Sequence, residues 1–238
     1  MPSGPLAGIG LTHLRVYGQR AAPDGKHSGC PHVHAVTHEA YYVVSGTGAL
    51  ELHDAKHGFR EVQLQPGSLV QFAPGTLHRA VNTGDLTALC IMGNAGLAER
   101  GDARIWFGAE VDADAGAYQA LWRLPAEKGL DGALERRDRS VAAYMKLLRL
   151  WDSDREAYFS ELKRFIDVHA NAVASLRERF AEVVAAGPAA WLQESLSRIE
   201  ALPGSSGDTD AICVTPESDV PRFGMCGLLG PLEIATTI

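Results

Sequence analysis

The chain has 238 residues, of which 46% are hydrophobic, so it can bury one large core or two small ones. Its net charge of −7 and its sequence pI of about 5.7 disfavour a surface that binds nucleic-acid phosphates or an anionic membrane. No apolar run approaches the roughly 20 residues that span a bilayer, and the N-terminus lacks the pattern of a signal peptide. We therefore expect a small-molecule ligand or substrate, and no nucleic-acid or membrane partner.

Short runs rich in Val, Tyr, Phe and Leu occupy residues 10–107, and Gly, Pro, Asn and Asp separate them. Because no helical pattern interrupts these runs, they indicate a β-sandwich or a closed barrel. We expect hairpin connections at Gly46–Gly48 and Asn82–Asp85. The predicted strands cover residues 11–17, 40–44, 49–53, 59–64, 68–73, 78–81, 86–92 and 104–107.

After about residue 110 the hydrophobic period changes from two to about 3.6, which predicts helices. The clearest helix runs from Asp154 to Val184, and His169 lies on its apolar stripe, where we interpret it as a core histidine with a hydrogen-bond partner. Gly187 and Pro188 are expected to end this helix and to begin another at about 188–202. Two further helices are predicted at about 133–151 and 115–121.

These patterns divide the chain into three parts: a β-barrel domain at 1–110, a helical extension at 111–203, and a loop-rich tail at 204–238 that could pack back on the barrel. The helices could form a separate domain or a layer against the barrel. The four cysteines are scattered, which is typical of reduced thiols in a cytoplasmic protein. A Cys213–Cys226 disulfide is the alternative.

A candidate metal site begins at His32 and His34, because residues two apart in a strand face the same side. Two imidazoles on one side can reach the same metal ion. Glu39 follows after four residues, which leave room for a bend and a return on the next strand. His78, just after a turn-forming segment, is the candidate for the fourth ligand.

The spacing of these residues resembles the two motifs of the cupin superfamily. Two positions depart from the motifs, since Lys26 and Ala73 stand where Gly and Pro are expected. The resemblance covers residues 10–107 and implies an all-β jelly-roll barrel (a double-stranded β-helix) that holds one divalent metal on His32, His34, Glu39 and His78. It also implies a homodimer. The matching residues are His32, His34, Glu39 and Gly46 in the first motif, and Gly67, Gly75, His78 and Asn82 in the second.

Other residues near these motifs have two interpretations each. Tyr41 would share the inward face with Glu39 and is a candidate catalytic residue, although wall packing is the alternative. His38 could compete with Glu39 as a ligand, but strand alternation allows only one of the two to point inward. Asn82 is either a turn residue or a site residue. Cys30 is read as a small buried residue, with a thiolate ligand as the alternative.

We expect Arg79 and four other histidines to lie away from the candidate metal site. If His78 points into the barrel, its neighbour Arg79 should point away from it. We expect the other histidines at the surface or in loops, namely His13, His27, His53 and His57.

Three imidazoles and one carboxylate leave about two open positions on an octahedral metal. Iron there would favour dioxygen chemistry, whereas manganese, nickel or zinc would favour isomerisation or hydrolysis. The first hypothesis is a metal-dependent dioxygenase or isomerase that acts on a small oxygenated metabolite. The second is a non-catalytic binding or sensing module whose helices dimerise, and the third is a barrel in which the metal is structural.

Overall fold

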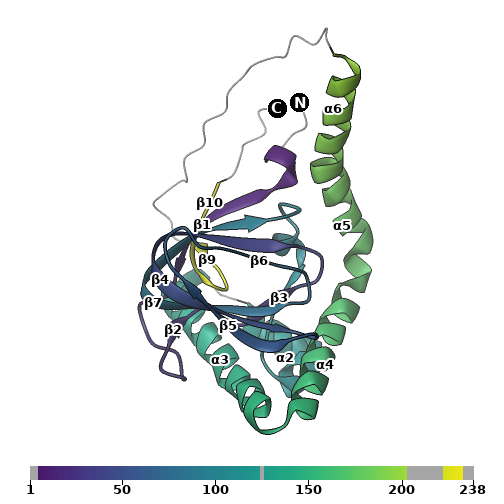
Figure 1. Cartoon of the computed structure of the whole chain (residues 1–238). Coiled ribbons are helices and arrows are strands. Elements are labelled where there is room, and N and C mark those ends of the chain that lie inside the picture. Colours follow the sequence, from purple (N-terminus) through teal and green to yellow (C-terminus); the bar gives the residue numbers. More distant parts are fainter. Residues whose placement is uncertain (1–4, 124–125, 203–221, 233–238) are drawn as a thin grey trace.

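The computed structural model describes residues 5–123, 126–202 and 222–232 (Figure 1). Strands come first, helices follow, and a short C-terminal hairpin returns to the sheet. The strands are β1 (Gly10–Val16), β2 (His27–Ser28), β3 (His32–His34), β4 (Glu39–Asp54), β5 (Gly58–Leu64), β6 (Leu69–Phe72), β7 (Leu77–Met92), β8 (Ala103–Ile105), β9 (Arg222–Phe223) and β10 (Gly227–Pro231). The α-helices are α1 (Ala109–Ala113), α2 (Ala115–Trp122), α3 (Gly129–Ser153), α4 (Arg155–Val173), α5 (Arg177–Val184) and α6 (Ala190–Glu200).

The strands form one large antiparallel sheet in the order β5-β4-β7-β1-β10-β9. Strand β6 pairs with β4, β2 pairs with β7, and β3 lies between β7 and β8. Among the described strands no pairing joins the two ends of this order, so the sheet is not closed and the predicted jelly-roll barrel is not confirmed. The observed architecture is a large antiparallel sheet followed by a helical region.

The two predicted hairpins are wrong, because Gly46–Gly48 and Asn82–Asp85 lie inside long strands. Strands β4 and β7 each run for 16 residues and pair along most of that length. Their register shifts near Thr47, where both strands bend together. Gly46 has φ +77°, and a Cβ there would lie 2.3 Å from the Asp85 carbonyl oxygen. Glycine is therefore needed here because the backbone of β7 comes close to that of β4. In the sequence alone, such a glycine cannot be distinguished from a glycine in a turn.

Alternate residues of the strands face a buried core on the inner side of the sheet. In β4, Glu39, Tyr41 and Val43 are buried while Tyr42 and Val44 are exposed, which confirms the expected inward face. Cys226 reaches the same core from the loop between β9 and β10. The other buried members are Leu14, Val16, Leu50, Leu52, Leu64, Phe72, Ala80, Leu86, Ala88 and Cys90.

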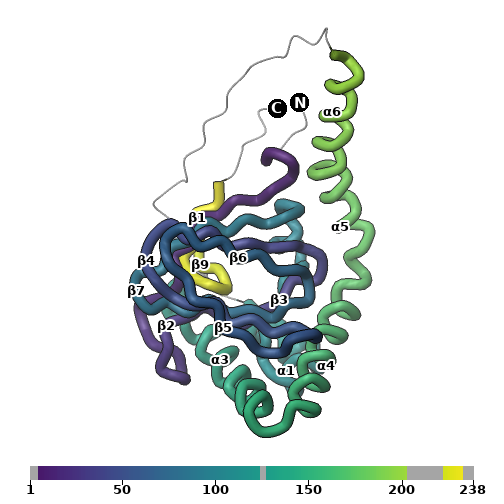
Figure 2. The backbone as a smooth tube through the Cα atoms, viewed as in Figure 1, coloured from purple at the N-terminus to yellow at the C-terminus, as the bar shows by residue number. Residues whose placement is uncertain are grey.

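The helices α3 and α4 form a layer against the outer side of the sheet (Figure 2). Their apolar faces share one buried cluster with three residues of the β region, Val33, Leu77 and Trp106. Of the two alternatives for the helices, a separate domain or a layer, the structure shows the layer, because α3 and α4 share a buried core with the sheet. The helical members of the cluster are Tyr144, Leu147, Tyr158, Leu162 and Phe165.

The helical path continues through Gly187 and Pro188, so the predicted stop at this pair is wrong. A π-helical turn covers Ala185–Ala189 and leads directly into α6. Proline has no N–H to donate, and the chain accommodates it in a widened turn without ending the helix. Helix α6 carries exposed apolar side chains, including Leu192 and Ile199. Among the described residues, no helix is both long and apolar enough to cross a bilayer.

Two residues assigned to the exterior of the barrel are buried beneath the helices. Arg79 points away from the inner core, as expected, and its Nε lies 3.1 Å from a Glu51 carboxylate oxygen. His53 was predicted at the surface, but it is fully buried. Its two ring nitrogens contact the hydroxyls of Tyr144 and Tyr158, at 2.5 and 2.8 Å. The prediction was wrong because strand alternation shows that His53 faces outward but cannot show that helices cover that face.

The C-terminal part of the chain is described only at 222–232, so most of the predicted loop-rich tail lies outside the described residues. Cys213, one half of the alternative disulfide, also lies outside them. Strand β10 pairs with β1 and with β9, two pairings that the sequence did not suggest.

Candidate metal centre

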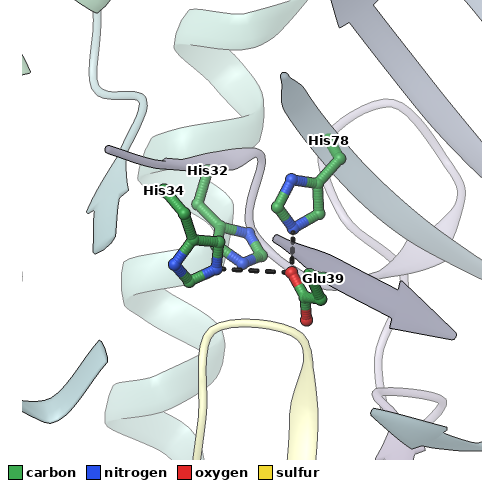
Figure 3. A group of neighbouring side chains, drawn as sticks. All are labelled: His32, His34, Glu39 and His78. Carbon is green, nitrogen blue, oxygen red and sulfur yellow. Dashed lines mark ion pairs between the residues drawn. The ribbon is translucent and has the colours of Figure 1, made fainter. Parts of the chain in front are cut away.

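The structure brings His32, His34, Glu39 and His78 together on the inner side of the sheet (Figure 3). The two outer residues of β3 are His32 and His34, which point to the same side as alternation requires. Glu39 is the first residue of β4, and His78 lies on β7 directly opposite His32. One nitrogen or oxygen of each residue lies within 4.8 Å of those of the other three.

Each imidazole is held by an oxygen atom at Nδ1. The Nδ1 of His32 lies 3.0 Å from the Cys30 carbonyl oxygen, and that of His78 lies 3.0 Å from the Thr76 carbonyl oxygen. The Nδ1 of His34 lies 3.1 Å from Oδ2 of Asp102. When such a ring is neutral and its proton stays on the Nδ1 that faces the oxygen atom, Nε2 keeps its lone pair. This tautomer is the one in which Nε2 can bind a metal.

The unpaired atoms of the cluster fit a divalent cation. Oε2 of Glu39 lies 3.3 Å from Nε2 of His34 and 3.1 Å from Nε2 of His78. Both Oε2 of Glu39 and Nε2 of His78 are buried, and neither has a hydrogen-bond partner outside the cluster. Buried polar atoms without partners are costly, and a metal bound between them would satisfy both. Three imidazoles and a carboxylate form a donor set that suits zinc, iron, manganese or nickel.

The charges of the metal-free cluster favour an ionised carboxylate. Burial raises the pKa of Glu39, but the imidazoles of His34 and His78 beside it outweigh burial and hold this pKa well below its usual range. Burial lowers the pKa of His34, yet the carboxylates of Asp102 and Glu39 raise it to about 9. Burial lowers the pKa of His32 well below its usual value. An ionised Glu39 and a neutral His32 are the protonation states that a metal requires of its ligands, whereas His34 would have to release a proton when a metal binds.

Two residues at the site could not be found from the sequence. Asp102 precedes β8 and holds His34, but its spacing from the motifs follows no rule. Cys226 comes from the C-terminal hairpin, and its Sγ lies 3.8 Å from Nε2 of His32. Both contacts join segments far apart in the chain, at separations of 68 and 194 residues.

The other candidates lie outside the cluster of four. His38 is exposed, as expected if Glu39 points inward. The Tyr41 hydroxyl lies 3.2 Å from Sγ of Cys226. Asn82 lies inside β7, and its Oδ1 accepts hydrogen bonds from the backbone N–H groups of residues 84 and 86 of the same strand. Cys30 contacts His32 through its carbonyl oxygen, and its thiol is buried.

Comparisons with known proteins find a family model that matches the first part of the chain. Residues 19–92 match the family model of the cupin domain. No curated protein matches the chain at a significant level.

Three solved structures are each similar to about a third of this chain. The capsular polysaccharide assembling protein CapF from Staphylococcus aureus is 21% identical over 35% of this chain and 23% of its own, with a TM-score of 0.26. WlaRA from Campylobacter jejuni, a TDP-fucose-3,4-ketoisomerase, is 9% identical over 35% of this chain and 58% of its own, with a TM-score of 0.29. The cupin protein BF4112 from Bacteroides fragilis is 23% identical over 37% of this chain and 65% of its own, with a TM-score of 0.25.

In all three cases the match covers less than two thirds of the other protein, and similarity of this size carries no inference about activity. The match to the family model covers both histidine-containing motifs. Residues 19–92 of this chain therefore match the cupin domain, which confirms the resemblance that the two motifs indicated.

Proposed function

We propose that this cupin binds one divalent metal ion through His32, His34, Glu39 and His78, and that the metal serves an enzyme of the dioxygenase or isomerase class. One observation carries the metal site: three imidazoles, each with Nδ1 beside an oxygen atom, gather with the Glu39 carboxylate so that one ligand atom of each residue lies within 4.8 Å of the others. The jelly-roll barrel at 1–110 and the helical extension at 111–203 belong to this proposal as the scaffold of the site.

A metal at this position would polarise a carbonyl or enolate oxygen of a small oxygenated metabolite, or activate dioxygen if it is iron. The residues around it supply a dry environment, since the four ligands are at most 4% exposed. Burial raises the pKa of Tyr41 well above its usual range, so the hydroxyl keeps its proton. Tyr41 would therefore act as a hydrogen-bond donor at the site, and it cannot serve as an anionic base at neutral pH.

A second candidate function is a non-catalytic binding or sensing module that forms a homodimer. The burial of the four candidate ligands supports a non-catalytic role, because a substrate would have to pass the C-terminal hairpin, whose Cys226 lies against His32. The exposed apolar residues of α6, such as Leu196 and Ile199, are suitable for contact with a second copy. The free thiols of the described cysteines agree with a reducing, cytoplasmic location, which is also part of the proposal.

The test compares wild-type protein with His34→Ala and with His38→Ala, whose side chain is exposed one residue from Glu39. Each protein is loaded with iron, manganese, nickel or zinc and incubated with small carboxylic acids, phenols and sugars. Turnover that disappears in His34→Ala, with the far-UV circular dichroism unchanged, supports the enzyme. Saturable ligand binding without turnover in every metal form supports the module, and loss of folding in His34→Ala alone indicates a structural metal.

A further inference from the structure

Asp102 is a buried junction between the candidate metal ligand His34, the segment that follows it, and helix α4. Both oxygens of its carboxylate have hydrogen-bond partners. Oδ1 accepts a hydrogen bond from the Val36 N–H at 2.7 Å, and Oδ2 lies 3.3 Å from the Thr37 nitrogen and 3.1 Å from Nδ1 of His34. The Asp102 side chain is 0% exposed and that of His34 is 3% exposed. Burial raises the pKa of Asp102, but the hydrogen bonds from His34 and Thr37 outweigh it and lower this pKa.

The backbone of Asp102 is held as firmly as its side chain. Its carbonyl oxygen accepts the Ala35 N–H at 3.0 Å. The same oxygen lies 2.7 Å from Nε2 of His169, a residue of α4 that is only 3% exposed. Since a carbonyl oxygen can only accept, His169 donates from Nε2. A helix that lies outside the cupin match thus reaches the residue that holds a metal ligand.

We propose that Asp102 and His169 are positioning residues of the metal centre. The Asp102 carboxylate orients the His34 ring and accepts from its Nδ1, so that Nε2, which faces Glu39, is the nitrogen that can bind a metal, and His169 anchors Asp102 from helix α4. The proposal rests on the proposed function, because it assigns these residues a role only if the cluster of four binds a metal. It also gives the helical region a task at the site.

Substitution by asparagine tests the carboxylate because it keeps the shape of the side chain. An amide has one acceptor oxygen and one N–H₂ donor, whereas both oxygens of Asp102 face donors. If the amide oxygen stays on the Val36 N–H, the N–H₂ group faces His34 and favours the ring with its proton on Nε2. That tautomer cannot bind a metal through Nε2.

The experiment measures the binding of Co²⁺ to the full chain by competition with a chelating dye, together with the visible absorption of bound Co²⁺. Asp102→Asn should weaken Co²⁺ about 10- to 100-fold and change the absorption bands, as is usual when the partner of a metal-bound histidine is removed. His169→Phe removes the donor from α4 and should weaken Co²⁺ several-fold, whereas His169→Gln keeps a donor and should restore binding.

Tyr158→Phe is the matched control, because Tyr158 is also a buried hydrogen-bonding residue of α4 but contacts His53. It should leave the Co²⁺ affinity and spectrum unchanged even if it destabilises the helix layer. The proposal is overturned if wild-type protein binds Co²⁺ and both Asp102→Asn and His169→Phe bind it within twofold of wild type. If wild-type protein binds no Co²⁺, the metal site itself is wrong, and this outcome is distinct from the failure of the positioning role alone.

Discussion

At the scale of single residues, the polar groups beneath the helices are held by charges as well as by packing. Glu51 and Arg79 are both fully buried and lie against each other, and Lys26 and Asp24 contact them from the rim. The Tyr144 hydroxyl donates to Glu51, and the Arg79 guanidinium lies 5.2 Å from the centre of the Tyr144 ring. Removal of the Arg79 charge would leave the buried Glu51 carboxylate with Lys26 and the Tyr144 hydroxyl but without its buried counter-charge.

Arg79→Met should therefore lower the free energy of unfolding by roughly 3–5 kcal/mol, because it leaves the buried Glu51 carboxylate short of a partner. Urea denaturation followed by circular dichroism measures the loss. Arg60→Met is the control, since the Arg60 side chain is 47% exposed and its ion pair with Asp54 is worth about 1 kcal/mol or less. Equal losses in the two variants would contradict the buried network.

His53 makes the stability depend on pH. Burial lowers its pKa in the folded protein to about 3, with a further contribution from Arg79, whereas an unfolded histidine has a pKa of about 6.5. The unfolded chain thus binds more protons between these values, so folding stability falls as the pH drops below about 6.5. Between pH 7 and pH 5 this histidine should cost about 2 kcal/mol.

The measurement compares the free energy of unfolding of wild-type protein and His53→Gln at pH 7 and at pH 5. Glutamine offers a donor and an acceptor to the two tyrosines without titrating. All other side chains are the same in both proteins, so their contributions cancel in the comparison. A variant that loses as much stability as wild type over this range would show that His53 is not the group responsible.

At the scale of elements, the sequence identified most strands and helices but misplaced their ends. Alternation placed Glu39, Tyr41 and Val43 on one buried face, and the motif spacing selected the four residues that gather. The long strands β4 and β7 were each read as two, because a local pattern cannot distinguish a glycine at a bend from a glycine in a turn.

The contacts that join distant segments were also beyond prediction. Asp102 reaches His34 only when β8 pairs with β3. His53 and Cys226 acquire their partners only when the helices and the C-terminal hairpin pack on the sheet. Nothing in the residues near each of them in the sequence specifies those partners. His169 was the exception, since its place on the apolar stripe of a helix predicted a buried histidine with a hydrogen-bond partner, and both features are confirmed.

Packing of the helix layer can be tested at Phe165, a fully buried residue of α4 whose ring centre lies 4.7 Å from that of Trp106. Phe165→Ala should destabilise the protein by about 3–5 kcal/mol because it leaves a cavity between helix and sheet. Leu192→Ala on α6 is the control, since Leu192 is 61% exposed and should change stability by less than about 0.5 kcal/mol. A small effect at Phe165 would mean that the helix layer is not part of the core.

At the scale of the whole molecule, the sheet carries the candidate metal ligands and the helices hold the surroundings of the site. Cys226 approaches from the C-terminal hairpin, and Asp102 connects the site to α4. The four ligands come from three strands that meet only in the folded chain. Metal binding should therefore stabilise the whole fold, because the unfolded chain has no such site.

Metal stoichiometry is the most direct test. Wild-type protein and His38→Ala, dialysed against Zn²⁺ and then against metal-free buffer, should each retain about one equivalent by elemental analysis, as expected for a site with four protein ligands. His78→Ala should retain much less, since it removes a ligand that is 0% exposed at the centre of the cluster. Equal metal content in wild type and His78→Ala, or none in wild type with any divalent metal, would contradict the metal centre.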